Sequence, residues 1–208
     1  MRETSAAYFR LYLILSFVLR FSRPLLGLNN LLGDGVLIFE NIRSDLRSYG
    51  GNWASQGFWV MLVYRFGRWR YTVRTRPVRK VFSFIYHILF KLIQILTGVE
   101  LPCEVNVGKN FVIDHFGGII ISGFATFGDN CRIRNGVVVG LSHVEDRCAP
   151  SIGSNVDIGA GAKLLGRITI GNNVLVGANS VVLCNVPDNS IAVGVPALVK
   201  PLKRKIRL

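Results

Sequence analysis

Three histidines are the chain's candidates for proton transfer, and His115 stands in the most unusual setting. It follows Asp114 and comes just before two glycines, so the side chains around it are small. Histidine titrates near neutral pH, which suits the removal of a proton from a hydroxyl group. His87 falls in an apolar helical stretch and His143 opens an irregular segment. We therefore predict that His115 is a general base rather than an ordinary surface residue.

The stretch from Leu101 to about Pro187 must position His115, and its apolar residues recur every six positions. This period fits neither an amphipathic helix nor an alternating strand, and it is typical of a parallel β-helix in which neighbouring turns bury each other's apolar face. We place a two-residue interruption at Ala125 and Thr126 and a longer one from His143 to Ser151, and we expect about four turns. His115 is third in its hexapeptide and should point outward. The leading apolar positions are Leu101, Val107, Ile113, Ile119, Phe127, Ile133, Val139, Ile152, Ile158, Leu164, Ile170, Val176 and Val182.

The segments before the repeat have a helical pattern. We expect a break at Gly33 to Gly35, a helix that ends at Gly50 and Gly51, a helix over 57–71, and a long aromatic helix after Pro77 that ends at Gly98. The last of these could be a core helix, an oligomer contact or a membrane-surface helix. The prediction is an α+β chain: a helical region over 1–98, a left-handed parallel β-helix of hexapeptide repeats over 99–198, and a basic tail over 199–208.

The charge balance points to an anionic partner. Lys and Arg number 25 against 12 Asp and Glu, a net charge of +13, which suits membrane lipid, nucleic acid or a polyphosphorylated cofactor. No nucleic-acid recognition motif accompanies the basic residues, so we predict no nucleic acid. The apolar run within residues 1–30 is too short to cross a bilayer, and it fits an amphipathic helix at a membrane surface or a helix packed on protein.

The cysteines give no sign of a metal site or a disulfide framework. The four cysteines lie far apart and form no Cys-x-x-Cys pair. This spacing argues against zinc, so we predict no metal. A reducing cytoplasm is the simplest location, with peripheral contact through residues 1–30 at the inner face of the membrane.

The motifs around His115 resemble the serine acetyltransferase family of hexapeptide acyltransferases. The resemblance covers about residues 42–198 and is strongest in VELPCEVNVGKNFVIDHFGGIIISG and in NVDIGAGAKLLGRITIGNNVLVGANSVVLCNVP, followed by GVPA. It implies a homotrimer, with acetyl-CoA as co-substrate in a cleft between the β-helices of adjacent subunits.

The resemblance also implies roles for single residues. His115 matches the family's catalytic base, Glu100 stands where an Asp orients that base, and Asp114 matches a residue of the acceptor pocket. Lys200 or Lys203 would lie near the phosphates of coenzyme A. The residues expected to line its arm are Gly159, Ala160, Gly161, Ala162, Lys163, Gly194, Pro196 and Ala197.

Two departures from the family pattern concern the acceptor. Where the family has Asp-Arg-His-Pro, this chain keeps Arg147 but has Cys148 in place of the second histidine. Asn52 stands where the family has an Asp that is available to the ammonium group of serine. Asp114, Asn52, Arg147 and His143 are the candidate acceptor-binding residues.

These departures favour acceptors other than serine. Our first prediction is an O-acetyltransferase that acts on a sugar hydroxyl of a surface polysaccharide, free or lipid-linked, as in exopolysaccharide acetyltransferases of the colanic-acid type. The alternative is serine O-acetylation for cysteine synthesis. A non-catalytic β-helix scaffold is the third interpretation.

Overall fold

The computed structural model describes residues 32–143, 145 and 147–202, with side chains from residue 38 onward. The described residues from Ile38 onward belong to one compact unit, separate from residues 1–37. Two predictions therefore lie outside the described residues: the amphipathic helix within 1–30 and the role of Lys203 near phosphates.

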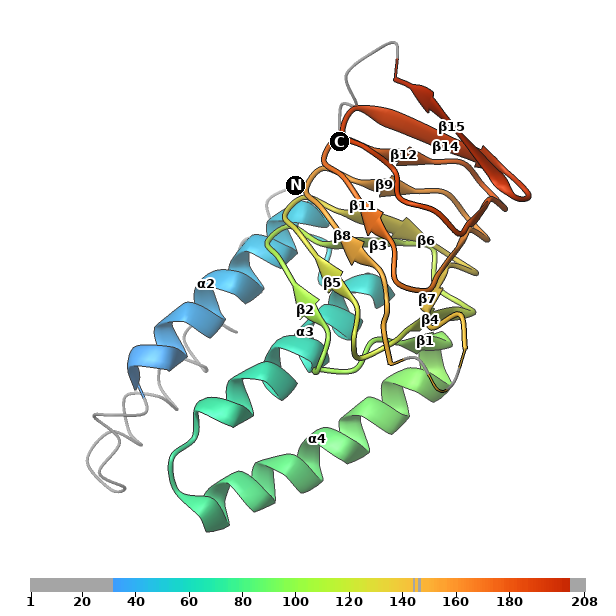
Figure 1. The fold of residues 1–208 in the computed structure, drawn as a ribbon. Helices are drawn as coiled ribbons and strands as arrows, with labels where there is room; N and C mark the ends of the chain where they lie inside the picture. The colour runs from blue at the N-terminus through green and yellow to red at the C-terminus, as the bar shows by residue number, and fades with distance from the viewer. Residues whose placement is uncertain (1–31, 144, 146, 203–208) are drawn as a thin grey trace. The chain divides into compact units, whose positions relative to one another are not determined.

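The helical region contains α2 (Leu32–Ser48), α3 (Gln56–Trp69), the 3₁₀ turn η2 (Arg70–Thr72) and α4 (Arg76–Thr97) (Figure 1). Pro77 lies in the first turn of α4, where a proline costs no hydrogen bond, and Gly98 ends the helix with a φ of 63°. The expected break at Gly33 to Gly35 is wrong, because α2 runs through both glycines. A glycine costs a helix only about 1 kcal/mol relative to alanine, which does not by itself end one.

The β-helix that follows, which we call the coil, consists of short strands in three sheets. Sheet A has the order β1-β4-β7-β10-β13, sheet B has β11-β8-β5-β2, and sheet C has β15-β14-β12-β9-β6-β3. All neighbours are parallel except β14 and β15. The strands are β1 (Val99–Glu100), β2 (Asn106–Val107), β3 (Val112–Asp114), β4 (Ile119–Ile121), β5 (Thr126–Phe127), β6 (Arg132–Arg134), β7 (Val138–Gly140), β8 (Ser151–Ile152), β9 (Asp157–Ile158), β10 (Lys163–Leu165), β11 (Thr169–Ile170), β12 (Leu175–Val176), β13 (Val181–Val182), β14 (Ser190–Gly194) and β15 (Ala197–Pro201).

The predicted left-handed parallel β-helix is confirmed. The chain visits sheets A, B and C in turn, and every predicted leading side chain is buried. Sheet A has 5 strands, so the coil makes about five turns rather than four.

The first interruption of the repeat lies at His115 and not at Ala125. Ile113 pairs with Ile133, whereas Ile121 pairs with Val139. Eight positions separate Ile113 from Ile121, but six separate their partners, so the two extra residues fall within the turn 115–118. Ile121 therefore takes the leading position. Ile119, which is also buried, lies two places before it.

Asparagines stack along the edge where sheet B meets sheet C. Each adopts a positive φ of 55–57°, and each side-chain amide except the last donates to the side-chain oxygen of the asparagine in the next turn, at 2.9–3.1 Å. Asparagine tolerates the left-handed region better than most residues, because its short side chain can hydrogen-bond locally. The ladder runs through Asn110, Asn130, Asn155, Asn173 and Asn189.

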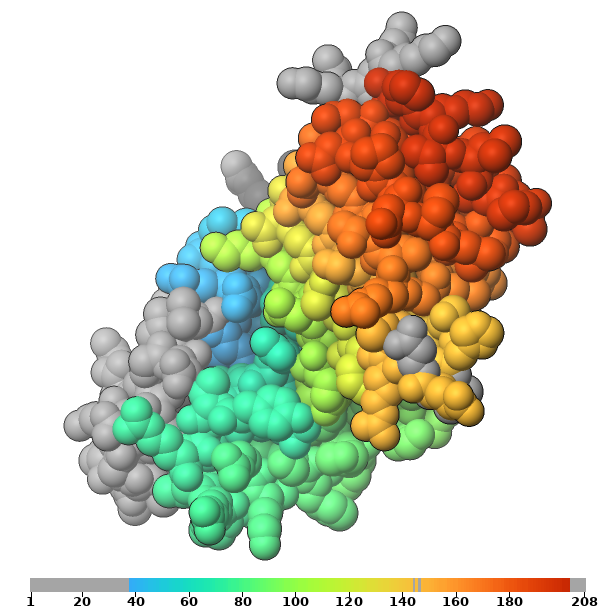
Figure 2. Space-filling model, in the orientation of Figure 1, coloured from blue at the N-terminus to red at the C-terminus, as the bar shows by residue number. Residues whose placement is uncertain are grey.

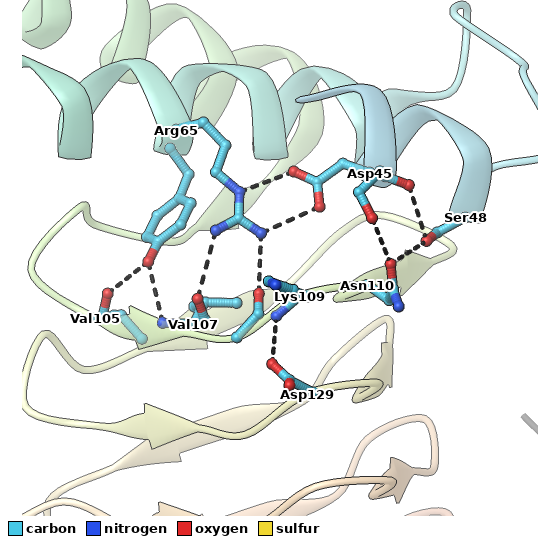
Figure 3. Close-up of polar contacts among 11 residues, drawn as sticks. Asp45, Ser48, Arg65, Val105, Val107, Lys109, Asn110 and Asp129 are labelled. Carbon is cyan, nitrogen blue, oxygen red and sulfur yellow. Dashed lines mark hydrogen bonds and ion pairs between the residues drawn. The ribbon is translucent and has the colours of Figure 1, made fainter. Parts of the chain in front are cut away.

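A buried ion pair joins α2 to α3, and its arginine also bonds to the first turns of the coil (Figure 3). Arg65 of α3 donates to both carboxylate oxygens of Asp45 of α2, at 2.8 and 3.1 Å, and to the carbonyl of Gly108 at 2.9 Å. The hydroxyl of Tyr64 donates to the carbonyl of Val105 at 2.8 Å. In the space-filling view, α3 and α4 (teal to green) close the lower end of the coil (Figure 2).

Candidate active site

His115 lies on the edge of the coil where strands of sheet C end and strands of sheet A begin, which we call the His115 edge. Peptide hydrogen bonds of 2.8 Å connect successive turns along this edge: Gly136 N–H to Gly117 C=O, and Gly161 N–H to Asn135 C=O. The structure therefore stacks the turn of His115 and the segment 159–163 on one edge, separated by a single turn of the coil.

The backbone at His115 is in the left-handed region, with a φ of 58°, and the side chain is exposed. An L-residue in this region costs roughly 1–2 kcal/mol, and such strain concentrates at functional sites. His115 lies in the turn that contains the two extra residues of the repeat. All other non-glycine residues with positive φ in the described part of the chain are asparagines: Asn110, Asn130, Asn155, Asn173, Asn179 and Asn189.

Glu100, the predicted orienting residue, lies on β1, the strand beside β4. It is exposed and pairs with Ile120 in the sheet. No hydrogen bond joins Glu100 to His115 within the part of the chain that the structure describes. Its role as the partner of His115 stays a prediction.

Asp114, next to His115, is held by an arginine that sequence reasoning missed. Arg132 of β6 donates to its carboxylate at 2.7 Å, with both side chains about a third exposed. Arg134 on the same strand forms an ion pair with Asp157 of β9. The sequence signal was the alternation Arg-Ile-Arg, which points both arginines out of sheet C, towards the carboxylates of the neighbouring turns.

The turn between α2 and α3, which contains Asn52, begins and ends with residues that contact the strand ending at Asp114. The peptide N–H of Ile113 donates to the hydroxyl of Tyr49 at 2.9 Å, and burial raises the pKa of that hydroxyl. Gly57 lies so close that a Cβ there would come within 2.5 Å of the Ile113 carbonyl oxygen. Asn52 is exposed and accepts a hydrogen bond from the N–H of Ala54 at 3.0 Å.

The predicted coenzyme A segment 159–163 is only partly available to a ligand. Ala162 is fully buried, and its N–H and C=O bond to Gly159 and Val138 within the coil. The ammonium group of Lys163 donates to the carbonyl of Gly136 on the same edge. Among the described residues, the half-buried Ala160 N–H has no hydrogen-bond partner, so it can donate to a ligand.

The hairpin of β14 and β15 carries a second predicted segment to the same edge. The N–H of Gly194 donates to the hydroxyl of Ser180 at 3.1 Å, which fixes the tip of the hairpin, including Pro196 and Ala197, beside this edge. Lys200 pairs with Ile191 near the far end of the hairpin, so the structure does not bring it to the tip.

The protruding loop leaves the coil from another edge, between β7 of sheet A and β8 of sheet B. His143 and Arg147 are exposed on it, and Cys148 is half-buried. Within one chain, the structure does not bring this loop to the His115 edge. In the described ranges, no group of three or more His, Cys, Asp or Glu side chains could hold a metal ion.

Comparison with known proteins relates this chain to enzymes of one family. Residues 149–184 match the family model "Bacterial transferase hexapeptide (six repeats)". The serine acetyltransferase of Synechococcus elongatus is 40% identical over 144 residues, which cover 69% of this chain and 56% of that protein. That of Staphylococcus aureus strain Mu50 is 48% identical over 48% of this chain and 47% of the relative. The chain thus spans about half the length of these curated relatives.

Solved structures of the same family cover a larger share of this chain. The serine acetyltransferase of Neisseria gonorrhoeae is 31% identical with a TM-score of 0.69, over 86% of this chain and 69% of that one. The Brucella abortus enzyme in complex with coenzyme A is 26% identical with a TM-score of 0.71, over 85% and 72%. The shared motifs, coil and helices assign this chain to the serine acetyltransferase-like family of hexapeptide-repeat acyltransferases.

Proposed function

We propose that this chain is an O-acetyltransferase that moves the acetyl group of acetyl-CoA to a hydroxyl group, with His115 as general base. The observation that carries the proposal is the strained, exposed histidine on the same edge as the two predicted coenzyme A segments. The names of the relatives and the coenzyme A in the Brucella abortus structure support the same activity.

In the proposed reaction, the imidazole of His115 takes the proton of the acceptor hydroxyl as its oxygen attacks the thioester carbonyl carbon. A C–O bond forms and the C–S bond breaks. The imidazolium then returns the proton to the sulfur of coenzyme A. A general base contributes about 10²–10⁴-fold to such a step. The free N–H of Ala160 would donate to a carbonyl oxygen of bound acetyl-CoA.

A homotrimer is part of this proposal. The loop with His143 leaves the coil at a different edge from His115. For both histidines to face one acceptor, a neighbouring copy would have to supply the loop. Large apolar side chains are exposed around the His115 edge, and a second copy would cover them. They are Phe116 (47% exposed), Ile120 (49%), Val195 (70%) and Leu198 (64%).

For the acceptor, the relatives support serine over the sugar that we predicted first from the sequence. The relatives and solved structures described above are serine acetyltransferases. A sugar hydroxyl remains the second candidate because of one contact: the carboxylate of Asp114 is already paired with Arg132. An ammonium group would have to compete with that guanidinium, whereas a sugar would not.

The test is coenzyme A release with each acceptor. We expect turnover of acetyl-CoA with L-serine, and O-acetylserine as the product by mass spectrometry. Turnover only with a sugar or a polyprenyl-linked sugar would establish the second candidate. If the folded protein neither transfers acetyl groups nor binds coenzyme A in calorimetry, it is a scaffold and the proposal fails.

Arg132→Gln should improve the use of serine. Releasing Asp114 from a partly exposed ion pair should lower the KM for L-serine by up to about fivefold, because such pairs contribute roughly 0.2–1 kcal/mol. Arg134→Gln is the matched control, since it breaks the pair with Asp157 one turn further along. Equal KM values for the wild type and Arg132→Gln would show that Asp114 does not contact the ammonium group.

A further inference from the structure

Helix α4 has an apolar face that the coil does not cover. Its core side carries Tyr86, Ile93 and Thr97, which are buried. The opposite side repeats large apolar side chains at spacings of three and four residues, so they form one continuous stripe. The stripe consists of Val78, Val81, Phe84, Ile85, Ile88, Leu92, Ile95 and Leu96, each 38–79% exposed.

A row of basic residues runs beside this stripe. Arg76, Lys80 and Lys91 are exposed, and their spacing of 4 and 11 residues places them along one line of the helix, next to Phe84. Helix α4 contains no Asp or Glu. The helix therefore has three sides: one on the coil, one apolar and exposed, and one positively charged.

By length and composition, α4 is long and apolar enough to cross a membrane. Its contacts with the coil and with α3 argue for a different position. The hydroxyl of Tyr86 accepts a hydrogen bond from the N–H of Cys103 at 3.0 Å, and Phe82 packs edge-on against Phe66 and Trp69. A membrane-spanning α4 would lose these contacts and would place the basic row in hydrocarbon.

We propose that the exposed side of α4 binds the surface of an anionic phospholipid membrane, with the helix lying in the plane of the interface. The apolar stripe would insert among the acyl chains, while the lysine and arginine side chains would meet the lipid phosphates. This arrangement leaves the core side of α4 on the coil. The occupant is a lipid surface rather than the α4 of a second copy, because α4 has no acidic residue that could pair with the basic row, whereas lipid phosphates can.

The experiment is flotation of the full chain with vesicles of phosphatidylcholine, with and without phosphatidylserine. We expect binding to the anionic vesicles that weakens with added salt. The triple variant Phe84→Ser, Ile88→Ser, Ile95→Ser should lower the bound fraction at least tenfold, since it replaces three exposed apolar side chains of the stripe by polar ones. Lys80→Gln with Lys91→Gln should reduce binding to the anionic vesicles by about fivefold per lysine.

Leu183→Ser and Lys109→Gln are the matched controls, because both side chains are exposed on the coil, away from α4. They should bind vesicles like the wild type. Circular dichroism and thermal unfolding verify that each variant is folded. The proposal is overturned if the α4 variants bind vesicles as the wild type does. Binding through residues 1–30 alone would give that result. It is equally overturned if the triple variant changes only the oligomeric state in sedimentation.

Discussion

His115→Asn should abolish acetyl transfer and leave the fold at least as stable. Asparagine cannot take the hydroxyl proton, so we expect kcat/KM to fall by about 10²–10⁴-fold in a coenzyme A release assay. Asparagine also suits the backbone conformation, since all other non-glycine residues with positive φ in the described chain are asparagines. The free energy of unfolding should therefore be unchanged or rise by up to about 1 kcal/mol.

His115→Asn separates a loss of catalysis from a loss of folding more clearly than His115→Ala would. Alanine at φ 58° adds strain of its own, so a loss of activity could follow from a distorted turn. His87→Asn is the control, because it removes an exposed histidine on α4, away from the His115 edge. Retention of more than a tenth of the wild-type kcat/KM in His115→Asn would end the assignment of His115 as general base.

The coil could be predicted from the sequence because the interior of a β-helix accepts one kind of side chain at a fixed interval. The phase of the repeat was harder to assign at Ile119 to Ile121, where three isoleucines follow one another. Ile119 and Ile121 are buried and Ile120 is half exposed, so a count in sixes fits Ile119 as well as Ile121. Only the pairing of Ile121 with Val139 shows that the extra residues belong to the turn of His115.

The residues on the His115 edge could be predicted from the sequence. The side-chain contacts between neighbouring turns could not. The resemblance to serine acetyltransferases pointed to His115 and to the segment 159–163 one by one. It could not show that Ala162 faces the core, or that Arg132 reaches the carboxylate of Asp114 in the turn before. Such contacts join residues 18 positions apart, and their partners depend on the register of the coil.

Asp45→Asn should be among the most destabilising single substitutions in the described chain. Asp45 is 1% exposed and Arg65 is 7% exposed, and the two make a bidentate pair between α2 and α3 (Figure 3). Without the carboxylate, the guanidinium stays buried with its charge uncompensated, which costs about 3–5 kcal/mol. Denaturant unfolding measures the loss, and Glu40→Gln, an exposed acidic residue of the same helix, is the control.

The double variant Asp45→Leu, Arg65→Met distinguishes the cost of an uncompensated buried charge from the loss of the contact between the two side chains. Breaking one partner leaves a buried charge, whereas replacing both by apolar side chains of similar size removes the desolvation cost as well. We therefore expect the double variant to recover most of the stability lost in Asp45→Asn. Arg65 also donates to the carbonyls of Val107 and Gly108, so recovery should stop about 1–2 kcal/mol short of the wild type. A double variant as unstable as the single one would mean that these carbonyl contacts, and not the ion pair, hold the helices to the coil.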